Sequence, residues 1–153
     1  MEWQAQLQIL EQVALAMLLA GVIGIEREFA HKPAGLRTHM LLGGASALLV
    51  CLAFTIVRRY AATTDYPMLK VDPTVVIQAV VTATGFLGAG TILRRQDAPE
   101  HVEGLTTAAS LLFVAAIGVC TALGQTLLAV GVTVLAFGTL HAVRWLEARI
   151  AKR

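Results

Sequence analysis

Four short blocks of polar residues and glycines hold the residue types that could support chemistry in this sequence. Glu26, in the first block, is a carboxylate that directly follows an apolar run. A partly desolvated carboxylate is costly unless a proton, a cation or a partner neutralises it, and Mg²⁺ requires oxygen ligands of this kind. The blocks are therefore candidates for an ion, ligand or partner site: Gly24-Ile25-Glu26-Arg27, Ala34-Gly35-Leu36-Arg37-Thr38-His39, Gly85-Phe86-Leu87-Gly88-Ala89-Gly90-Thr91 and Gly104-Leu105-Thr106-Thr107.

Glu26 and Arg37 form the first candidate pair. Each lies just outside an apolar run, so antiparallel neighbouring helices would place them at one depth, where a carboxylate and a guanidinium can pair. One interpretation is a salt bridge that clamps the two helices together. The other is an ion or ligand site, in which Glu26 is the best candidate metal ligand and the hydroxyls of Thr38, Thr106 or Thr107 support it.

Three glycines, Gly85, Gly88 and Gly90, stand close together in the third block. Each costs a helix about 1 kcal/mol relative to alanine, so something should offset them. The favoured interpretation is close helix packing, and the alternative is a locally broken helix whose freed carbonyls face a polar cavity. Close packing needs small residues four positions apart, and two pairs have this spacing: Ala20 with Gly24, and Gly85 with Ala89. The same spacing also suits a homodimer contact.

Thr106 and Thr107 stand where the fourth block enters an apolar run. Because the first N–H groups of a helix lack partners, capping by these threonines is favoured over the binding of an anion or carboxylate there. His31 and His39 flank the first polar segment and could sense pH, although a merely solvated role is favoured for both. The same role is expected of the other histidines, His101 and His141.

Motifs of known catalytic chemistry are absent from the sequence, which has no HExxH, CxxC, nucleophile elbow or phosphate-binding loop. Cys51 and Cys120 each lie within a long apolar run, where a cysteine behaves as a small buried hydrophobe. We therefore expect neither enzymatic activity nor a cofactor, with Mg²⁺ as the one ligand left open.

The elements that must position these blocks are apolar. The chain has 153 residues, of which 57% are hydrophobic and 14% charged, and its mean hydropathy is +0.72. Too few polar side chains remain to cover a water-facing domain of this size, which excludes a free-standing soluble enzyme. The sequence pI is about 8.8, but the basic residues occur in short clusters between apolar runs. That arrangement indicates a membrane protein and not a nucleic-acid-binding one.

Five apolar segments are long enough to cross a bilayer as helices, given that a span needs about 20 residues. None alternates apolar with polar residues as a barrel strand would. The sequence therefore predicts an all-α bundle of five transmembrane helices that forms one domain over residues 1–153, with no soluble domain after the last helix. The predicted spans are residues 7–25, 40–57, 75–93, 105–123 and 127–143.

The distribution of positive charge predicts the orientation, because cytoplasmic segments carry an excess of Lys and Arg. With the N-terminus outside and the C-terminus inside, nine such residues lie on the inner side and three on the outer side. All four blocks then converge on the cytoplasmic boundary. Aromatic residues at or beyond the predicted span ends support the same spans: Trp3, Tyr60, Tyr66 and Trp145.

The four blocks, in this order and spacing, resemble the MgtC/SapB family. The resemblance covers roughly Ala20–Gln125 and includes the extension of the fourth block through Ala108-Ala109-Ser110. It implies a bacterial inner-membrane protein with about five transmembrane helices that is linked to growth under Mg²⁺ limitation. By motif position, the resemblance implies that the residues of the family's motifs correspond here to the following: Glu26, Arg37, Thr38, the Gly85–Gly90 segment, Thr106 and Thr107.

Two departures from the family pattern stand out. The best-known members continue into a soluble C-terminal domain, whereas few residues follow the fifth apolar run here. Leu111-Leu112 stands where relatives often have Leu-Trp. A regulatory function assigned to that soluble domain is therefore not transferred.

Two functions of different class follow. In the first, a non-enzymatic membrane protein, dimeric in the bilayer, acts through a cytoplasmic-side polar site or by binding other membrane proteins, as the resemblance implies for the F-type ATP synthase. In the second, the chain is itself a transporter or channel for Mg²⁺ or another small solute. In the second function, Glu26 and a glycine-broken third helix line the path. The predicted site residues on the cytoplasmic side are Glu26, Arg27, Arg37, Thr38, Gly85, Gly88, Gly90, Thr106 and Thr107.

Overall fold

Five long helices and one short β-ribbon make up the fold. A computed structural model of the chain describes residues 3–63, 72, 74–94 and 102–150. The helices are α1 (Trp3–Phe29), α2 (Leu36–Thr63), α3 (Thr74–Thr91), α4 (Leu105–Ala122) and α5 (Thr126–Ile150). The antiparallel strands β1 (Leu93–Arg94) and β2 (Val102–Glu103) pair between α3 and α4. This ribbon was not expected, because strands so short have no readable sequence period.

All five helices are long and apolar enough to cross a membrane. The candidate spans are Trp3–Phe29, Leu36–Arg59, Thr74–Thr91, Leu105–Ala122 and Thr126–Trp145. Large apolar side chains cover the outer faces, with Phe86 80% and Leu127 88% exposed. Such faces suit a hydrocarbon solvent and not water. The prediction of an all-helical membrane bundle is confirmed.

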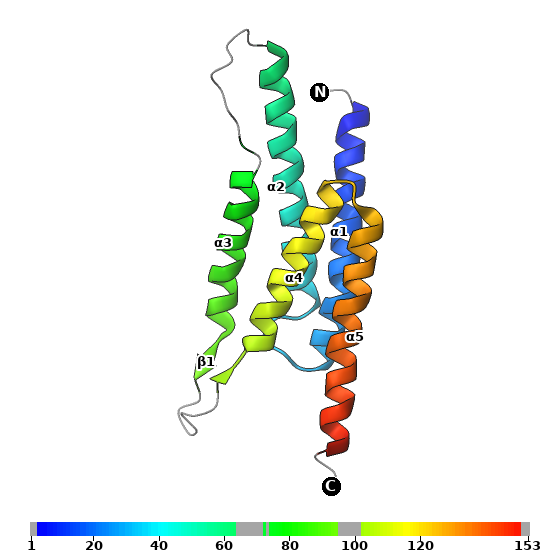
Figure 1. Cartoon of the computed structure of the whole chain (residues 1–153), viewed down its shortest axis with the longest axis vertical. Coiled ribbons are helices and arrows are strands. Elements are labelled where there is room, and N and C mark those ends of the chain that lie inside the picture. Colours follow the sequence, from blue (N-terminus) through cyan, green and yellow to red (C-terminus); the bar gives the residue numbers. More distant parts are fainter. Residues whose placement is uncertain (1–2, 64–71, 73, 95–101, 151–153) are drawn as a thin grey trace.

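Helix α4 is central, because it contacts each of the other four helices. Helices α1 and α2 pack against each other most extensively, α5 covers α1 and α4, and α3 packs mainly against α4 (Figure 1). The α1–α2 connection, the β1–β2 ribbon and the last turns of α5 lie at the bottom of Figure 1, here called the lower end. The start of α1 and the α4–α5 turn lie toward the opposite, upper end.

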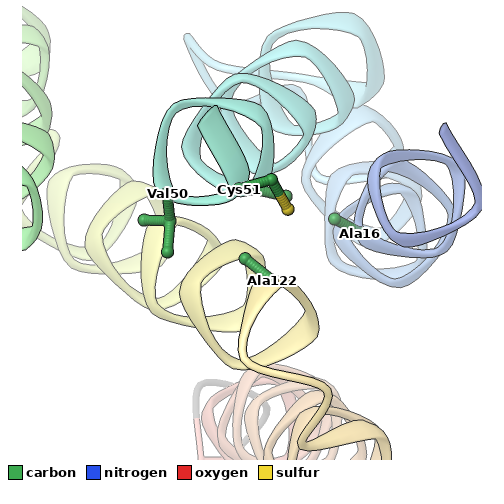
Figure 2. Packing of buried hydrophobic residues seen from close by; sticks show 5 residues of the cluster. Ala16, Val50, Cys51 and Ala122 are labelled. Carbon is green, nitrogen blue, oxygen red and sulfur yellow. The ribbon is translucent and has the colours of Figure 1, made fainter. Parts of the chain in front are cut away.

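The helices approach closely because small residues line their contacts. Figure 2 shows Ala16 of α1, Val50 and Cys51 of α2 and Ala122 of α4 converging in one buried cluster. A Cβ added to Gly118 of α4 would collide with the backbone of α2 and would lie 2.8 Å from Cβ of Ser46. Cys51 is buried, as predicted for a small hydrophobe.

Two glycines with positive φ shape the connections to α4. Gly104 (φ 94°) turns the chain from β2 into α4, and Gly124 (φ 71°) closes the turn into α5. Only glycine adopts such angles without strain. The N–H of Gln125 donates to the carbonyl of Cys120 at 2.9 Å, and α4 and α5 form a tight hairpin.

Candidate functional site

The lower end brings together the four sequence blocks. Gly24 of α1 is so close to α2 that an added Cβ would lie 2.8 Å from Cα of Leu36. Gly88 of α3 lies against Ala108 of α4, with an added Cβ 3.2 Å from the alanine Cβ. Gly104 abuts the carbonyl of Thr91 at the end of α3. Residues from all four blocks therefore share one region of the bundle.

A buried ion pair stands at the centre of this region. The Nε of Arg27 donates to Oε2 of Glu26 at 2.6 Å, and only 4% of each side chain is exposed. Nη1 of Arg144, on α5, lies 3.6 Å from Oε1 of the same carboxylate, and its side chain is 53% exposed. Two guanidinium groups thus face one carboxylate, and the excess charge of the cluster is positive.

The predicted pairing of Glu26 with Arg37 is wrong. Arg37 and Thr38 are exposed at the start of α2, because Leu36 and His39 occupy the face of that helix that packs on Gly24. The carboxylate instead pairs with its own neighbour in sequence and with a residue of the last helix. Neither Arg37 nor Thr38 joins the buried cluster.

His39 is fully buried, which corrects the expectation that it is merely solvated. Its Nδ1 lies 2.9 Å from the carbonyl oxygen of Gly35, and its Nε2 lies 3.0 Å from Oγ of Ser110 on α4. Because a carbonyl only accepts, Nδ1 carries a proton. The hydroxyl of Ser110 is also 2.8 Å from the carbonyl of Thr107. His39 therefore joins α2 to α4 beside the ion pair.

The start of α2 is held by a residue that the sequence analysis missed. Oε2 of Glu28 accepts a hydrogen bond from the N–H of Leu36 at 2.9 Å. An acidic group is stabilising near the unpaired N–H groups at a helix N-terminus. A side chain on Gly35 would collide with this carboxylate, so the glycine leaves room for it.

The two threonines of α4 have different environments. Gly104 is the N-cap residue of α4 and no side chain caps it, so the predicted capping by Thr106 or Thr107 is wrong. The left-handed glycine already sets the direction of the chain there. Thr107 is buried, whereas Thr106 is exposed and faces a pocket.

The glycines of α3 also differ in how closely they are packed. The helix is continuous from Thr74 to Thr91, so the locally broken helix considered above is wrong. The close packing that was favoured holds for Gly88. It fails for Gly85 and Gly90, since an added Cβ at either would meet no described atom within 4 Å.

A pocket of about 500 Å³ opens beside the ion pair, between the end of α1, the start of α4 and the last turns of α5. It is called the lower pocket here. Three of its lining side chains are cationic, two are threonines and three are apolar: Arg27, Lys32, Arg144, Thr106, Thr139, Ala30, Leu140 and Val143. This composition suits a ligand that carries negative charge.

Comparison with known proteins establishes the relationship of the chain. The model of the MgtC family matches residues 13–149. The chain belongs to the MgtC family. It is 41% identical over 116 residues to "Putative magnesium transporter YhiD" of Escherichia coli (strain K12), which covers 74% of this chain and 50% of YhiD. The resemblance to MgtC/SapB proteins is thereby confirmed.

Two further relatives are similar over most of the chain. Protein SapB of Bacillus subtilis (strain 168) is 31% identical over 124 residues, and Protein MgtC of Brucella abortus (strain 2308) is 36% identical over 124 residues. The match covers 81% of this chain in both cases, but 51% of SapB and 46% of MgtC. The chain thus spans about half the length of the curated relatives it matches. No solved structure is significantly similar to it.

The residues of this MgtC-family chain do not fit the Mg²⁺ site for which Glu26 was the best candidate. Within the described ranges, no group of three His, Cys, Asp or Glu side chains could hold a metal ion. The Glu26 carboxylate already faces two guanidinium groups, which repel a divalent cation. The lower end is therefore better suited to an anion than to a metal.

Proposed function

We propose that this MgtC-family chain is a non-enzymatic, multi-pass protein of the bacterial inner membrane that acts through its lower end, by binding a ligand or another membrane protein. The observation that carries this proposal is the buried ion pair of Glu26 and Arg27, with the half-exposed Arg144 beside it and a pocket that opens next to all three. Charges buried at a membrane edge are costly, and a functional role is the default interpretation when they are retained.

The proposed orientation places the N-terminus outside and the lower end in the cytoplasm. Among the described residues, the segments at the lower end carry more Lys and Arg than those at the upper end, which supports this orientation. A phosphatase reporter that is active only in the periplasm, fused after Arg153, should be inactive. The same reporter inserted at Gly124 should be active, and the reverse pattern would overturn the orientation.

The second candidate function, a conduit for Mg²⁺, is less well supported. From Val13 to Ile25 in α1, and through the middle of the other described helices, there is no Asp, Glu, Lys or Arg. A path for a strongly hydrated divalent ion needs oxygen ligands along its length. Liposomes that contain the purified protein and a Mg²⁺ dye should show no uptake. Uptake that is lost in Glu26→Gln would establish the conduit and overturn our proposal.

The link to Mg²⁺ homeostasis is also a proposal, supported by family membership and by the magnesium in the name of the YhiD relative. A host strain without this protein should grow more slowly than wild type only in medium low in Mg²⁺. Wild-type chain and the upper-end variant Gln12→Leu should restore growth, whereas Glu26→Gln should not. Equal rescue by all three would contradict a role for the lower-end cluster.

The proposed homodimer uses the outer face of α3. Gly85, Phe86 and Gly90 are exposed there, so close approach of a second copy would offset the cost of the glycines. In a chain with both native cysteines replaced by alanine, Phe86→Cys should give a disulfide-linked dimer in membranes. Leu127→Cys, equally exposed on α5, is the control and should remain monomeric. Equal cross-linking at both positions would argue against this interface.

A further inference from the structure

We propose that the lower pocket and the apolar groove that adjoins it bind one anionic phospholipid of the inner leaflet. The phosphate would lie among the cationic side chains of the pocket, and one acyl chain would follow the groove between α4 and α5. This inference deepens the proposed function and rests on it, since it names the ligand class of the same lower-end site.

Arg27 provides the first observation. Its side chain is buried and lines the pocket, and its Nε is engaged by Glu26. Its Nη1 is also buried, yet it has no hydrogen-bond partner among the residues that the structure describes. A buried charged donor without an acceptor is strongly unfavourable, and a phosphate oxygen is the acceptor that guanidinium groups match best.

The charge balance of the pocket also favours an anionic ligand. Arg27, Lys32 and Arg144 line it, and the neighbouring carboxylate of Glu26 offsets only one of the three positive charges. The hydroxyls of Thr106 and Thr139 add polar groups at the rim. A monoanionic phosphodiester would therefore find an excess of positive charge, whereas a zwitterionic headgroup would bring its own cation into a cationic site.

The groove provides the second, independent observation. It has a volume of about 290 Å³, and six of its nine lining side chains, from α1, α4 and α5, are apolar, while the other three carry hydroxyl groups. It shares Thr106, Thr139 and Leu140 with the lower pocket, so the two spaces adjoin each other. From there it reaches Phe113, about 10 Å deeper along α4 at a rise of about 1.5 Å per residue.

The combination favours a lipid over a free phosphate. The groove leads from the charged boundary toward the middle of the bundle, alongside α4 and α5, which lie side by side in Figure 1. Phe113 and Leu135 in it are 47% and 70% exposed, so an acyl chain could cover them. A free phosphate would use only the charged part of the site.

The first experiment measures binding by native mass spectrometry of the delipidated protein. Phosphatidylglycerol should bind about tenfold more tightly than phosphatidylcholine with the same acyl chains. Arg144→Gln should remove this preference, and its half-exposed side chain makes the change tolerable to the fold. Arg149→Gln is the matched control, because this residue of α5 stacks on Trp145 and does not line the pocket, so the preference should persist. Equal binding of both lipids, or equal loss in both variants, would overturn the proposal.

The second experiment separates the two sources of phosphate. Ala109→Phe, which fills the groove, should weaken phosphatidylglycerol binding about tenfold, whereas Ala45→Phe on the exposed face of α2 should not. Inorganic phosphate and glycerol phosphate should compete only at far higher concentrations. If they compete as well as the lipid, and Ala109→Phe has no effect, the ligand is a free phosphate and the lipid proposal is wrong.

The failures of the two proposals differ. If the protein shows no lipid preference, transports no Mg²⁺ and still needs Glu26 for growth in low Mg²⁺, the lipid site alone is overturned. A protein that binds phosphatidylglycerol as described but takes up Mg²⁺ through Glu26 would support the lipid site and overturn the proposed function.

Discussion

The two ends of the α1–α2 hairpin both hold polar side chains, but they do so by different means. At the upper end, Sγ of Cys51 donates to Oε1 of Gln12 at 3.2 Å, beside a pocket of about 180 Å³ that Arg58 also lines. These groups, apart from the exposed Arg58, are neutral. At the lower end, Glu26 and Arg27 carry full charges and are almost completely buried.

The difference shows where the sequence retains costly groups. Neutral partners that hydrogen-bond to each other stabilise a helix pair at little cost. A buried ion pair is weak evidence for stability, because apolar residues of similar volume often stabilise a protein as well or better. A buried ion pair at the lower end therefore favours a functional role there. The neutral amide and thiol at the upper end favour a role in helix packing.

The largest expected effect comes from removing one partner of the lower ion pair. Glu26→Gln leaves Arg27 buried without its counter-charge and should lower the free energy of unfolding by about 3 kcal/mol. Gln12→Leu at the upper end should cost about 1 kcal/mol or less. Reversible unfolding by SDS in mixed micelles, followed by circular dichroism, measures both. Equal losses would remove the contrast between the two ends.

A double change sharpens this contrast. Glu26→Leu with Arg27→Met removes both charges and should recover most of the lost stability, because no unpaired charge stays buried. It should nevertheless fail to restore growth in low Mg²⁺. Recovery of both stability and growth would make the ion pair purely structural.

The next effect concerns the glycines of the lower end. An alanine at Gly24 would meet the backbone of α2, with Cβ 2.8 Å from Cα of Leu36, and should destabilise the protein by about 1–3 kcal/mol. Gly85→Ala meets no described atom of its own chain and, under conditions in which the protein is monomeric, should stabilise α3 by up to about 1 kcal/mol. The same unfolding assay compares them. Two losses of similar size in the monomer would contradict the difference in packing between Gly24 and Gly85.

The five helices could be predicted from the sequence because hydrocarbon imposes a length and a composition on each span. The meeting of the four blocks at one end also followed, since antiparallel helices place every second connection on the same side. Close packing was expected for Gly88 from its small size, and the structure identifies Ala108 as the residue against which it packs. The short ribbon of β1 and β2 had no comparable signal.

The partners within the site could not be predicted, because they depend on helix rotation. A rotation that brings Leu36 and His39 onto Gly24 turns Arg37 outward, and apolar periodicity is weak in helices that are apolar on every side. Arg144 comes from the last helix, far from Glu26 in sequence, so no spacing rule connects them. One feature of the sequence did point to a role for His39: it lies one helical turn after Gly35 in the second of the four blocks.

A smaller effect tests the contact between α2 and α4. His39→Ala removes the hydrogen bond to Ser110 and should cost about 1–2 kcal/mol, with some loss of packing included. Ser110→Ala should cost less, because its hydroxyl is small. If the two side chains interact, the double variant should be more stable than the sum of the single effects predicts, by about 1 kcal/mol. Strict additivity would show that His39 acts through packing alone.

The smallest effect is expected at Arg37, the residue that motif position favoured and that lies outside the buried ion pair. Its side chain is exposed at the start of α2, so Arg37→Gln should change the free energy of unfolding by no more than about 0.5 kcal/mol. Combined with Glu26→Gln, the two effects should add to within about 0.5 kcal/mol, since distant sites without shared partners are independent. A double variant clearly more stable than this sum would mean that Glu26 and Arg37 do interact in the membrane. The lower end would then contain a third guanidinium on the same carboxylate, and its contrast with the neutral upper end would be greater still.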